Sequence, residues 1–415
     1  MTYNTAIIPA AESGEEQFLI DEMFISRTDK RGVIKSGNEV FRRVSGYEWD
    51  RLIGAPYRLI RNPDMPKAVF WLMWQTIQAD KPMVAFVKNR SANGCWYWVL
   101  AVVVPLADGY LSAQIKPTGA VFAQVTALYA EILAAEQSQS QSLAPDKSGE
   151  LLLSRLAELG FPTYADFAAS ALEQELALRD AALGISNAVE SRVLASVGGS
   201  LRALAETQAD LMGEFDALQS IPTNMRIIAS RLEPSGGPIS ALSDNYKFSS
   251  TEISRRLEAF AGSANNLCQA MSDNVRDGLF LSSISRLMAQ MRAYSATESN
   301  NATGLDLVAE RAILSEAAVQ YRQLAQSVML KAERVSGELN LVSGEIRRMM
   351  LGLDTIRVMG RVESGRLGSA GVGLSATIDQ LDTRHASIAA ILQGLMNLSA
   401  TIKAGINTYQ RQIIA

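Results

Sequence analysis

Side chains that could act as nucleophiles or metal ligands are few and scattered along this 415-residue sequence. The two cysteines, Cys95 and Cys268, are far apart and lack the short spacing of a metal site or a redox pair. His385 is the single histidine, which excludes histidine-rich zinc sites and a haem sensor with a histidine ligand in the N-terminal half. Cys95, in a strand-like run, is expected to be a buried small residue rather than a redox centre. His385 is either a packed helix-seam residue or a proton switch.

The sequence contains no motif of an enzyme active site. It has no phosphate-binding G-x-x-x-x-G-K-[ST] loop, no kinase signature and no nucleophile with a histidine near it. We therefore expect that the protein is not an enzyme.

Composition indicates a folded, soluble protein that acts away from nucleic acid and membranes. Apolar residues make up 48% of the chain and charged residues 20%, and the formal net charge is −4. No run of basic residues offers a surface for nucleic acid or anionic lipid. The most apolar run, Trp96 to Leu106, is about half of the roughly 20 residues that a membrane-spanning helix needs. Because there is no signal peptide and cysteine is rare, a reducing cytoplasm is the expected location.

Aromatic residues and prolines divide the sequence into two parts. All five tryptophans precede residue 100, and no proline follows Pro238. Because rings and prolines suit a compact mixed domain, and their absence suits long helices, we predict an α+β first part and an all-helical second part. The polar stretch 134–150, AAEQSQSQSLAPDKSGE, is predicted to be a linker.

The first part has the turn residues of a small sheet. The run FISRTDKRGVIKSGN predicts two strands around a tight turn, and helical patterns follow at 39–44 and 65–78. Three more strand-like runs are separated by Ala92-Asn93-Gly94 and Ala107-Asp108-Gly109. This β-β-α-α-β-β-β order predicts an antiparallel sheet with helices on one face, a domain that can enclose a small ligand.

The second part shows long apolar stripes with alternating spacings of three and four residues. These stripes occupy residues 194–218, 321–356 and 374–409. Helix breakers at 233–238 and 368–373 turn the chain, and the polar segment 295–304 turns it back between them. Because about 60 residues separate successive turns, each arm would be about 90 Å long. We predict a long antiparallel four-helix coiled-coil bundle with both tips at the same end.

The two tips also match each other at a fixed offset of 135 residues. The matched pairs include Arg231-Leu232 with Arg366-Leu367, Gly236 with Gly371, and Ser240-Ala241 with Ser375-Ala376. Helical periodicity produces chance matches, but these residue types in one register across a turn predict an internal duplication. A duplicated hairpin would make the bundle a pseudo-dimer within one chain. This removes the need for dimerisation through the bundle, although its surfaces could still associate into larger arrays.

The first part resembles the PAS domain of bacterial aerotaxis receptors over roughly residues 20–120. The resemblance rests on SGY, the RxPDMPK run, the MW helix and KNR-x-x-NG-x-x-YWV. It implies FAD in the PAS pocket and a report of the redox state of this FAD to the chemotaxis machinery. The positions that the motifs assign to flavin binding are Asn38, Arg61, Asp64, Trp74 and Asn89.

An aromatic ring can stack on the flavin ring system, and Arg or Asn can bond its carbonyls or the diphosphate. The sequence departs from the family at Asn62, where the family has histidine, and at Met83, where a second tryptophan is expected. The alternative is an empty or differently occupied pocket in which Arg61 and Asp64 form a structural pair.

The second part resembles, in degenerate form, the cytoplasmic hairpin of methyl-accepting chemoreceptors. Residues 363–368 are similar to the E-A-A-R-A-G core of the receptor tip, whereas Ile228 stands where the first hairpin should carry a glutamate. The resemblance implies signalling contacts at Asn224, Arg231, Glu363 and Arg366. The alternative for Glu363 and Arg366 is an ordinary exposed ion pair. Four side chains are either methylation sites or ordinary solvent-exposed residues: Glu206, Gln208, Glu333 and Glu338.

The expected segments are a PAS sensor domain (18–120), a helical and polar linker (121–164), and two hairpins (165–298 and 299–415). The expected function is a soluble cytoplasmic transducer that senses redox, oxygen or energy state, with FAD as the expected cofactor. Its expected partners are the chemotaxis coupling protein and histidine kinase, or another signalling protein. The alternatives are a PAS-controlled scaffold or interaction protein outside chemotaxis, and a structural rod.

Overall fold

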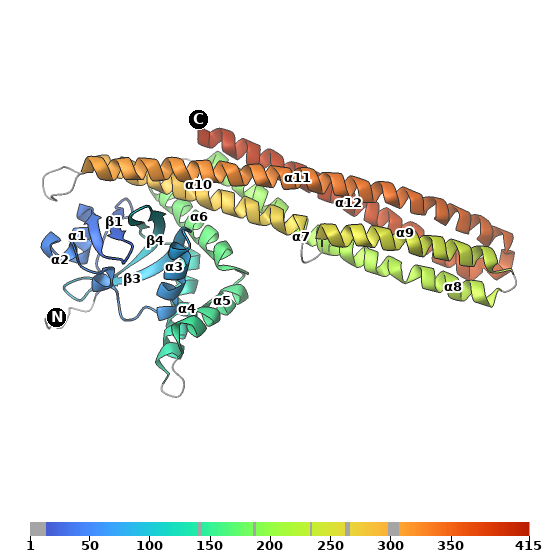
Figure 1. Ribbon diagram of the computed structural model, residues 1–415, viewed down its shortest axis with the longest axis horizontal. Coiled ribbons are helices and arrows are strands. Elements are labelled where there is room, and N and C mark those ends of the chain that lie inside the picture. The colour runs from blue at the N-terminus through green and yellow to red at the C-terminus, as the bar shows by residue number, and fades with distance from the viewer. Residues whose placement is uncertain are drawn as a thin grey trace. The chain divides into compact units, whose positions relative to one another are not determined.

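The computed structural model divides the chain into two compact units (Figure 1). The sensor unit comprises Met1–Asn187 and Arg276–Ala325, and the bundle unit comprises Ala188–Val275 and Gln326–Ala415. The structure describes residues 14–138, 143–185, 188–232, 235–261, 266–297 and 307–414. The division differs from the expected segments, because residues 165–185 and 276–297 join the sensor unit and not the first hairpin.

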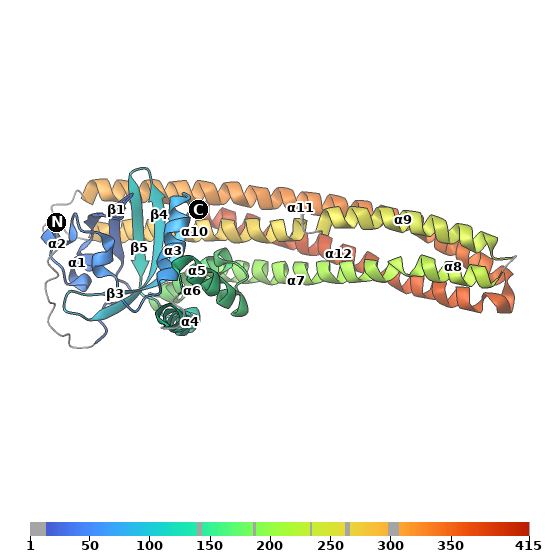
Figure 2. The same ribbon diagram turned by 60° about the horizontal axis from the view of Figure 1, so that its bottom comes forward.

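The sensor unit is built on a five-stranded antiparallel sheet with strand order β2-β1-β5-β4-β3 (Figure 2). Its strands are β1 (Phe24–Asp29), β2 (Ile34–Gly37), β3 (Met83–Arg90), β4 (Trp96–Leu106) and β5 (Gly109–Ile115). Between β2 and β3 lie α1 (Glu39–Ser45), α2 (Trp49–Leu52), the 3-10 helix η1 (Tyr57–Ile60) and α3 (Lys67–Gln78). This order of elements confirms the predicted α+β fold class.

The turn residues act as the sequence predicts. Asp29 Oδ1 accepts hydrogen bonds from the backbone N–H groups of Arg31 (2.8 Å) and Val33 (2.9 Å), which closes the β1–β2 turn. Gly109, at the start of β5, lies so close to β1 that a Cβ atom there would be 1.8 Å from the carbonyl oxygen of Thr28. Only glycine therefore lets β5 pair with β1 at this point.

The polar stretch 134–150, which we expected to be a linker, is mostly helical. Helix α4 (Ala120–Gln137) continues into it, and α5 (Pro145–Glu158) begins with a proline at its first position. Gly149 lies against the ring of Trp71, and the hydroxyl of the buried Ser148 donates to Glu136 at 2.6 Å. Small and polar residues serve here to bring α4 and α5 close together; residues 139–142 lie outside the described residues.

The bundle unit consists of four helical arms over the described residues. They are α7 with α8 (Ala188–Gln219 and Ile221–Arg231), α9 (Gly237–Ala261) with the start of α10 (Leu267–Thr297), the later part of α11 (Leu307–Arg366), and α12 (Val372–Ile414). Pro222 lacks a backbone N–H and accompanies the break between α7 and α8. The arms confirm the predicted all-α bundle. Most of the expected turn at 295–304 lies outside the described residues.

Contacts within the bundle unit repeat at the predicted offset of 135 residues. Arg226 pairs with Asp244 at 3.1 Å, and the equivalent Arg361 pairs with Asp379 at 2.8 Å. A Cβ atom at Gly236 would lie 2.0 Å from the carbonyl oxygen of Ala229, and one at Gly371 would lie 2.5 Å from that of Ser364. The two tips thus share a geometry that only glycine permits, which supports the predicted duplication.

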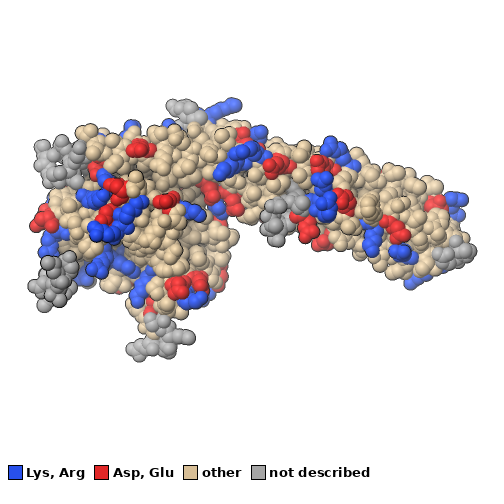
Figure 3. Space-filling view, in the orientation of Figure 1, with Lys and Arg blue, Asp and Glu red and all other residues tan. Residues whose placement is uncertain are grey.

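Acidic and basic side chains are intermixed on the face shown in Figure 3, without a large area of one sign. This distribution accords with the small net charge of −4. Within the described residues, no helix combines the length and apolarity that crossing a membrane requires.

Candidate ligand cavity and signalling tip

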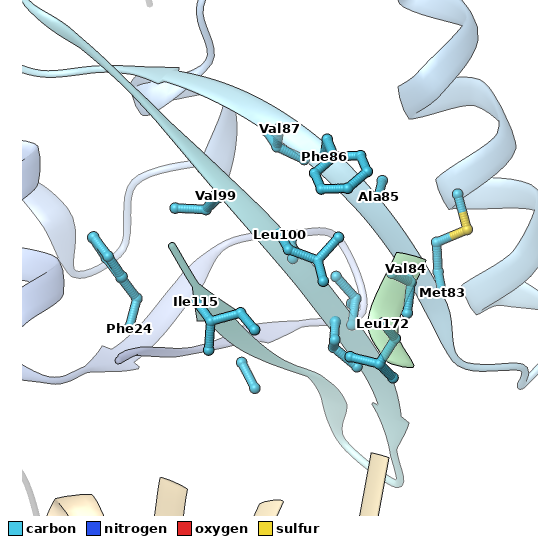
Figure 4. Close-up of a cluster of buried hydrophobic side chains, with 14 of the residues drawn as sticks. Phe24, Met83, Val84, Ala85, Phe86, Val87, Val99, Leu100, Ile115 and Leu172 are labelled. Carbon is cyan, nitrogen blue, oxygen red and sulfur yellow. The ribbon is translucent and has the colours of Figure 1, made fainter. Parts of the chain in front are cut away.

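The two faces of the sheet have different neighbours. One face packs on helices that follow the PAS strands: Phe86 contacts Phe122 of α4 and Phe167 of α6 (Tyr164–Ala182), and Leu172 of α6 lies beside Val84 (Figure 4). We expected helices on one face only; the sheet is covered on both, because α4 and α6 bring apolar residues from beyond the PAS strands. This leaves the other face for α3 and a cavity.

The cavity has a volume of about 310 Å³ and lies between the sheet and α3. Because strand residues alternate between faces, every second residue of β3, β4 and β5 reaches it. These strand residues are Val87, Asn89, Val99, Ala101, Val103, Tyr110, Ser112 and Gln114. From α3, residues spaced by three and four reach it: Phe70, Met73, Trp74 and Ile77.

Two buried amides in the cavity wall have atoms without a partner. Asn89 Nδ2 and Gln114 Oε1 make no hydrogen bond with any described residue, although both side chains are 2% exposed. Gln114 Nε2 donates to the hydroxyl oxygens of Tyr57 (2.6 Å) and Ser112 (2.9 Å), which fixes the orientation of the amide. A buried polar atom without a partner is costly, so the wall presents a donor and an acceptor suited to a polar ligand edge.

Ring systems and a cation complete the cavity. Trp74 packs edge-on against Tyr110 with ring centroids 5.8 Å apart, and Gly32 (φ +77°) leaves room for the indole. The guanidinium carbon of Arg61 lies 3.6 Å from the ring centroid of Phe70, and Arg61 forms no ion pair with a described carboxylate. Burial lowers the pKa of Arg61, whereas the charge of Glu136 acts to raise it. Such a cation can bind a carbonyl or a phosphate.

Three of the five predicted flavin-binding residues line this cavity: Arg61, Trp74 and Asn89. Asn38 does not line it. Its Oδ1 accepts from the backbone N–H groups of Phe41 (3.2 Å) and Ile25 (3.0 Å), and its Nδ2 donates to the Met23 carbonyl oxygen (2.8 Å). Asn38 therefore caps α1 and joins it to β1.

Asp64 also lies outside the cavity wall. Its exposed carboxylate accepts from Lys88 Nζ at 2.8 Å, so the alternative pairing of Arg61 with Asp64 is wrong as well. Asn62, in the place of the family histidine, is buried, and its Oδ1 accepts from the backbone N–H of Asp64 at 2.9 Å. Met83, in the place of the family tryptophan, is buried at the start of β3.

Sequence reasoning missed Gln114, Ser112 and Tyr57. A signal for the first two was present in β5, GYLSAQI, where polar residues at alternate positions interrupt an otherwise apolar strand. Nothing in the local sequence marks Tyr57. Burial raises the pKa of its hydroxyl, so the group stays protonated near neutral pH.

The cavity residues fit the ring system of a flavin. Its flat apolar faces suit Trp74, Phe70 and Met73, and its edge of carbonyl oxygens and a ring N–H suits Asn89 Nδ2 and Gln114 Oε1. The volume lies at the lower end of the roughly 300–1,000 Å³ that is usual for ligand pockets, so the cavity suits the ring system of a flavin, and the rest of a dinucleotide would lie outside it.

The predicted tip residues gather at one end of the bundle unit. A Cβ atom at Gly373, in α12, would lie 4.0 Å from Ile228 Cδ1, in α8, so the two tips are neighbours. Asn224 and Arg231 are exposed on α8. Glu363 pairs with Arg366 at 3.0 Å, and this exposed pair contributes little to stability. Ile228 replaces the expected glutamate where the two tips pack together.

Cys95 and His385, the remaining reactive side chains, lie outside the cavity and the tips. Cys95 is half-buried in the loop before β4, not buried in a strand as we expected, because its backbone N–H donates to Asn93 Oδ1 (2.9 Å) and β4 begins only at Trp96. His385 is buried; its Nδ1 lies 3.0 Å from Asp354 Oδ1 and its Nε2 lies 2.9 Å from the Tyr246 hydroxyl. Burial lowers the pKa of His385, although Asp354 acts in the opposite direction.

The sheet and its cavity identify the fold of the N-terminal part. Residues 34–111 match the family model described as the PAS fold, and this part of the chain is a PAS domain. It is similar to the aerotaxis receptor of Escherichia coli (strain K12), with 39% identity over 124 residues, which cover 29% of this chain and 24% of that receptor. The chain thus matches about a quarter of the receptor's length. The helical bundle fits a chemoreceptor-like architecture.

Other similarities also cover less than a third of this chain. A nitrogen fixation regulatory protein of Klebsiella pneumoniae is 30% identical over 84 residues, which cover 20% of this chain and 17% of that protein. A light-oxygen-voltage domain studied with a flavin analogue is 18% identical, with a TM-score of 0.23, and covers 26% of this chain and 85% of its own. The light state of the Aureochrome1 LOV domain is 21% identical, with a TM-score of 0.22, and the match covers 28% of this chain and 91% of that domain.

Proposed function

We propose that this chain is a sensory transducer whose PAS domain binds FAD noncovalently and senses redox, oxygen or energy state. The observation that carries the proposal is the pair of unpartnered amide atoms, Asn89 Nδ2 and Gln114 Oε1, in a ring-lined cavity. The similarity to the aerotaxis receptor supports it. When bound, the flavin supplies reversible electron transfer. The cavity residues bind and orient it: Trp74 covers the ring system, Asn89 donates to its edge, and Gln114 accepts from it.

Gln114 connects the cavity with the sheet. Its oxygen faces the ligand edge, while its nitrogen is held by Tyr57 and Ser112. A change of charge or protonation at the ligand edge would alter the hydrogen bond to the oxygen and so shift an amide that is anchored on β5. Because β5 pairs with both β1 and β4, such a shift reaches the centre of the sheet.

We further propose that the protein acts without catalysis, by passing the signal to the chemotaxis coupling protein and histidine kinase. The exposed tip residues Asn224 and Arg231 and the Glu363–Arg366 pair support this output. A second candidate is a PAS-controlled scaffold outside chemotaxis. The packing of Ile228 against the other tip, at the position of the expected glutamate, favours this second candidate.

The flavin proposal is tested by absorbance of the purified chain and by mass spectrometry of the released cofactor. We expect one FAD per chain, and at least a tenfold loss of FAD affinity in Asn89→Leu, because a buried donor to the ligand is removed. Asp64→Asn is the matched control, since Asp64 lies outside the cavity, and should retain FAD. A folded, colourless chain that takes up no added FAD would end the proposal.

The output proposal is tested by binding of the chain to purified coupling protein and kinase. We expect binding that Glu363→Ala with Arg366→Ala weakens at least tenfold, while Arg255→Ala, an exposed residue on α9, leaves it unchanged. A chain that retains FAD but binds neither partner would support the scaffold outside chemotaxis.

A further inference from the structure

Large apolar side chains are exposed along α11 within the bundle unit. Leu341, Leu351 and Val362 are 62%, 63% and 59% exposed. The apolar stripe is defined by Leu330, Leu341, Leu351, Val358, Met359 and Val362. At about 100° per residue, these side chains fall within an arc of about 100° around the helix, so they share one face over about 48 Å. Single exposed apolar side chains are common, but a continuous exposed apolar surface of this length usually marks an interaction site.

Glycines alternate with these side chains on the same helix. Gly337, Gly344 and Gly352 lie inside α11, and a Cβ atom at any of them would meet no other atom within 4 Å. Glycine inside a helix is less favourable than alanine. Since nothing in the bundle unit approaches these three positions, its packing does not explain them. The face therefore carries both projecting side chains and open shallow sites.

The first hairpin, which contains α7 and α8, shows the same face without the apolar side chains and the glycines. At the equivalent positions, 135 residues earlier, Leu341 is matched by Glu206 and Leu351 by Asp216. The glycines and Val358 are likewise replaced, with Arg202 for Gly337, Ala209 for Gly344, Ala217 for Gly352 and Thr223 for Val358. Only Val362 keeps a large apolar equivalent, Ile227, which is 46% exposed. The hairpin fold thus tolerates a polar face at these positions. The apolar stripe has a cause outside the hairpin.

We propose that the apolar stripe of α11 binds the same stripe of a second copy of this chain in antiparallel orientation. A helix face that carries both large apolar side chains and glycines can be complementary to itself, because the side chains of one copy can lie over the glycines of the other. With the two-fold axis between residues 351 and 352, Leu351 of each copy meets Gly352 of the other. Met359 then meets Gly344, and Leu341 meets Val362.

Charges favour the same arrangement. In the antiparallel pair, Glu338 comes beside Arg366 of the other copy, and Arg348 faces Thr355. A parallel pair in register would instead place Arg348 against Arg348 and glycine against glycine, with like charges together and the open sites unfilled. The interface is independent of the cavity and does not rest on flavin binding.

Sedimentation of the full chain over a range of concentrations tests the interface. We expect a reversible dimer, at least tenfold weaker in the variant with Leu341→Gln and Leu351→Gln. Phe248→Gln is the matched control, because Phe248 is 79% exposed and lies on α9, outside the apolar stripe; it should leave the dimer unchanged. A monomer at all concentrations, or a dimer that the double variant does not weaken, would overturn the proposal.

Cysteine crosslinking tests the orientation in a background with Cys95→Ala and Cys268→Ala. Gly352→Cys lies next to the two-fold axis and should link to itself. Gly337→Cys, which lies far from the axis, and Ala217→Cys, on the duplicated hairpin, should not. Circular dichroism checks that each variant is helical. Self-linking of Gly337→Cys would show a parallel pair, and self-linking of Ala217→Cys would place the interface on the other hairpin; either result overturns the proposed dimer.

Discussion

Two asparagines of the PAS domain show how the surroundings decide the role of a residue. Asn38 and Asn89 are both buried, but the Asn38 side chain is held by Met23, Ile25 and Phe41, whereas Asn89 Nδ2 has no partner among the described residues. The first amide stabilises the fold, and the second is available to a ligand. The sequence motifs assigned both to the same site.

His385 gives a pH-dependent prediction for the bundle unit. Burial lowers its pKa in the folded state below the ordinary value of about 6.5, so the unfolded chain binds the proton first as pH falls. Stability should therefore be unaffected by this residue above about pH 7 and should decline as pH falls below about 6.5. The Tyr246 hydroxyl at Nε2 suits the neutral ring, whereas Asp354 at Nδ1 opposes the effect of burial on the pKa of His385.

The measurement is the midpoint of helix unfolding by circular dichroism at about pH 7.5 and about pH 5.5. His385→Gln should reduce the difference between these two midpoints. An equal pH dependence in the variant and the original chain would show that other groups cause it.

Elements of the sensor unit are joined by carboxylates that complete the ends of other helices. Glu136 of α4 accepts from the first backbone N–H groups of α3, at Lys67 (2.8 Å) and Ala68 (2.9 Å). Glu175 of α6 accepts from the N–H groups of Thr118 (2.7 Å) and Gly119 (2.8 Å), just before α4. Burial raises the pKa of Glu175, and the backbone hydrogen bonds oppose this change. A negative charge is favourable at a helix N-terminus, so each helix fixes its neighbour.

Replacement of Glu136 tests this connection. Glu136→Ala should destabilise the sensor unit by about 3 kcal/mol, since a buried charged acceptor is lost and the α3 N–H groups remain unpaired. Glu131 lies on the same helix as Glu136, and Glu131→Ala, which removes an exposed ion pair to Arg155 of α5, should cost less than about 1 kcal/mol. Chemical denaturation followed by tryptophan fluorescence measures both. Equal effects of the two substitutions would contradict the proposed role of Glu136.

At the scale of the whole molecule, the sensor unit is discontinuous in sequence. Residues of α10 and the start of α11 share one hydrophobic core with the PAS domain, among them Ile284, Met288 and Leu314. Polar contacts join the same segments, with Arg27 paired to Glu310 at 2.9 Å and Arg276 to Asp166 at 2.9 Å. Helix α10 and the start of α11 are therefore part of the sensor core.

This arrangement predicts that a core substitution far along the chain destabilises the PAS domain. Met288→Ala should cost about 2–5 kcal/mol, the usual range for a buried methionine. Tryptophan fluorescence reports the sensor unit, because all five tryptophans precede residue 100. The control is Leu392→Ala, which is equally buried in the bundle unit and should shift the fluorescence transition less. An unchanged transition in Met288→Ala would rule out a shared core.

The sequence by itself determined the α+β part, the order of its elements, the long helices and the repeated tips. These features depend on local signals, namely hydrophobic period, turn residues and helix breakers, which act over a few residues. The tertiary structure alone decided that Asn89 and Gln114 face the cavity while Asn38 and Asp64 do not. It also decided that α10 and α11 complete the sensor core. Such features depend on contacts between residues far apart in the chain, and no local pattern specifies which distant residue will meet which.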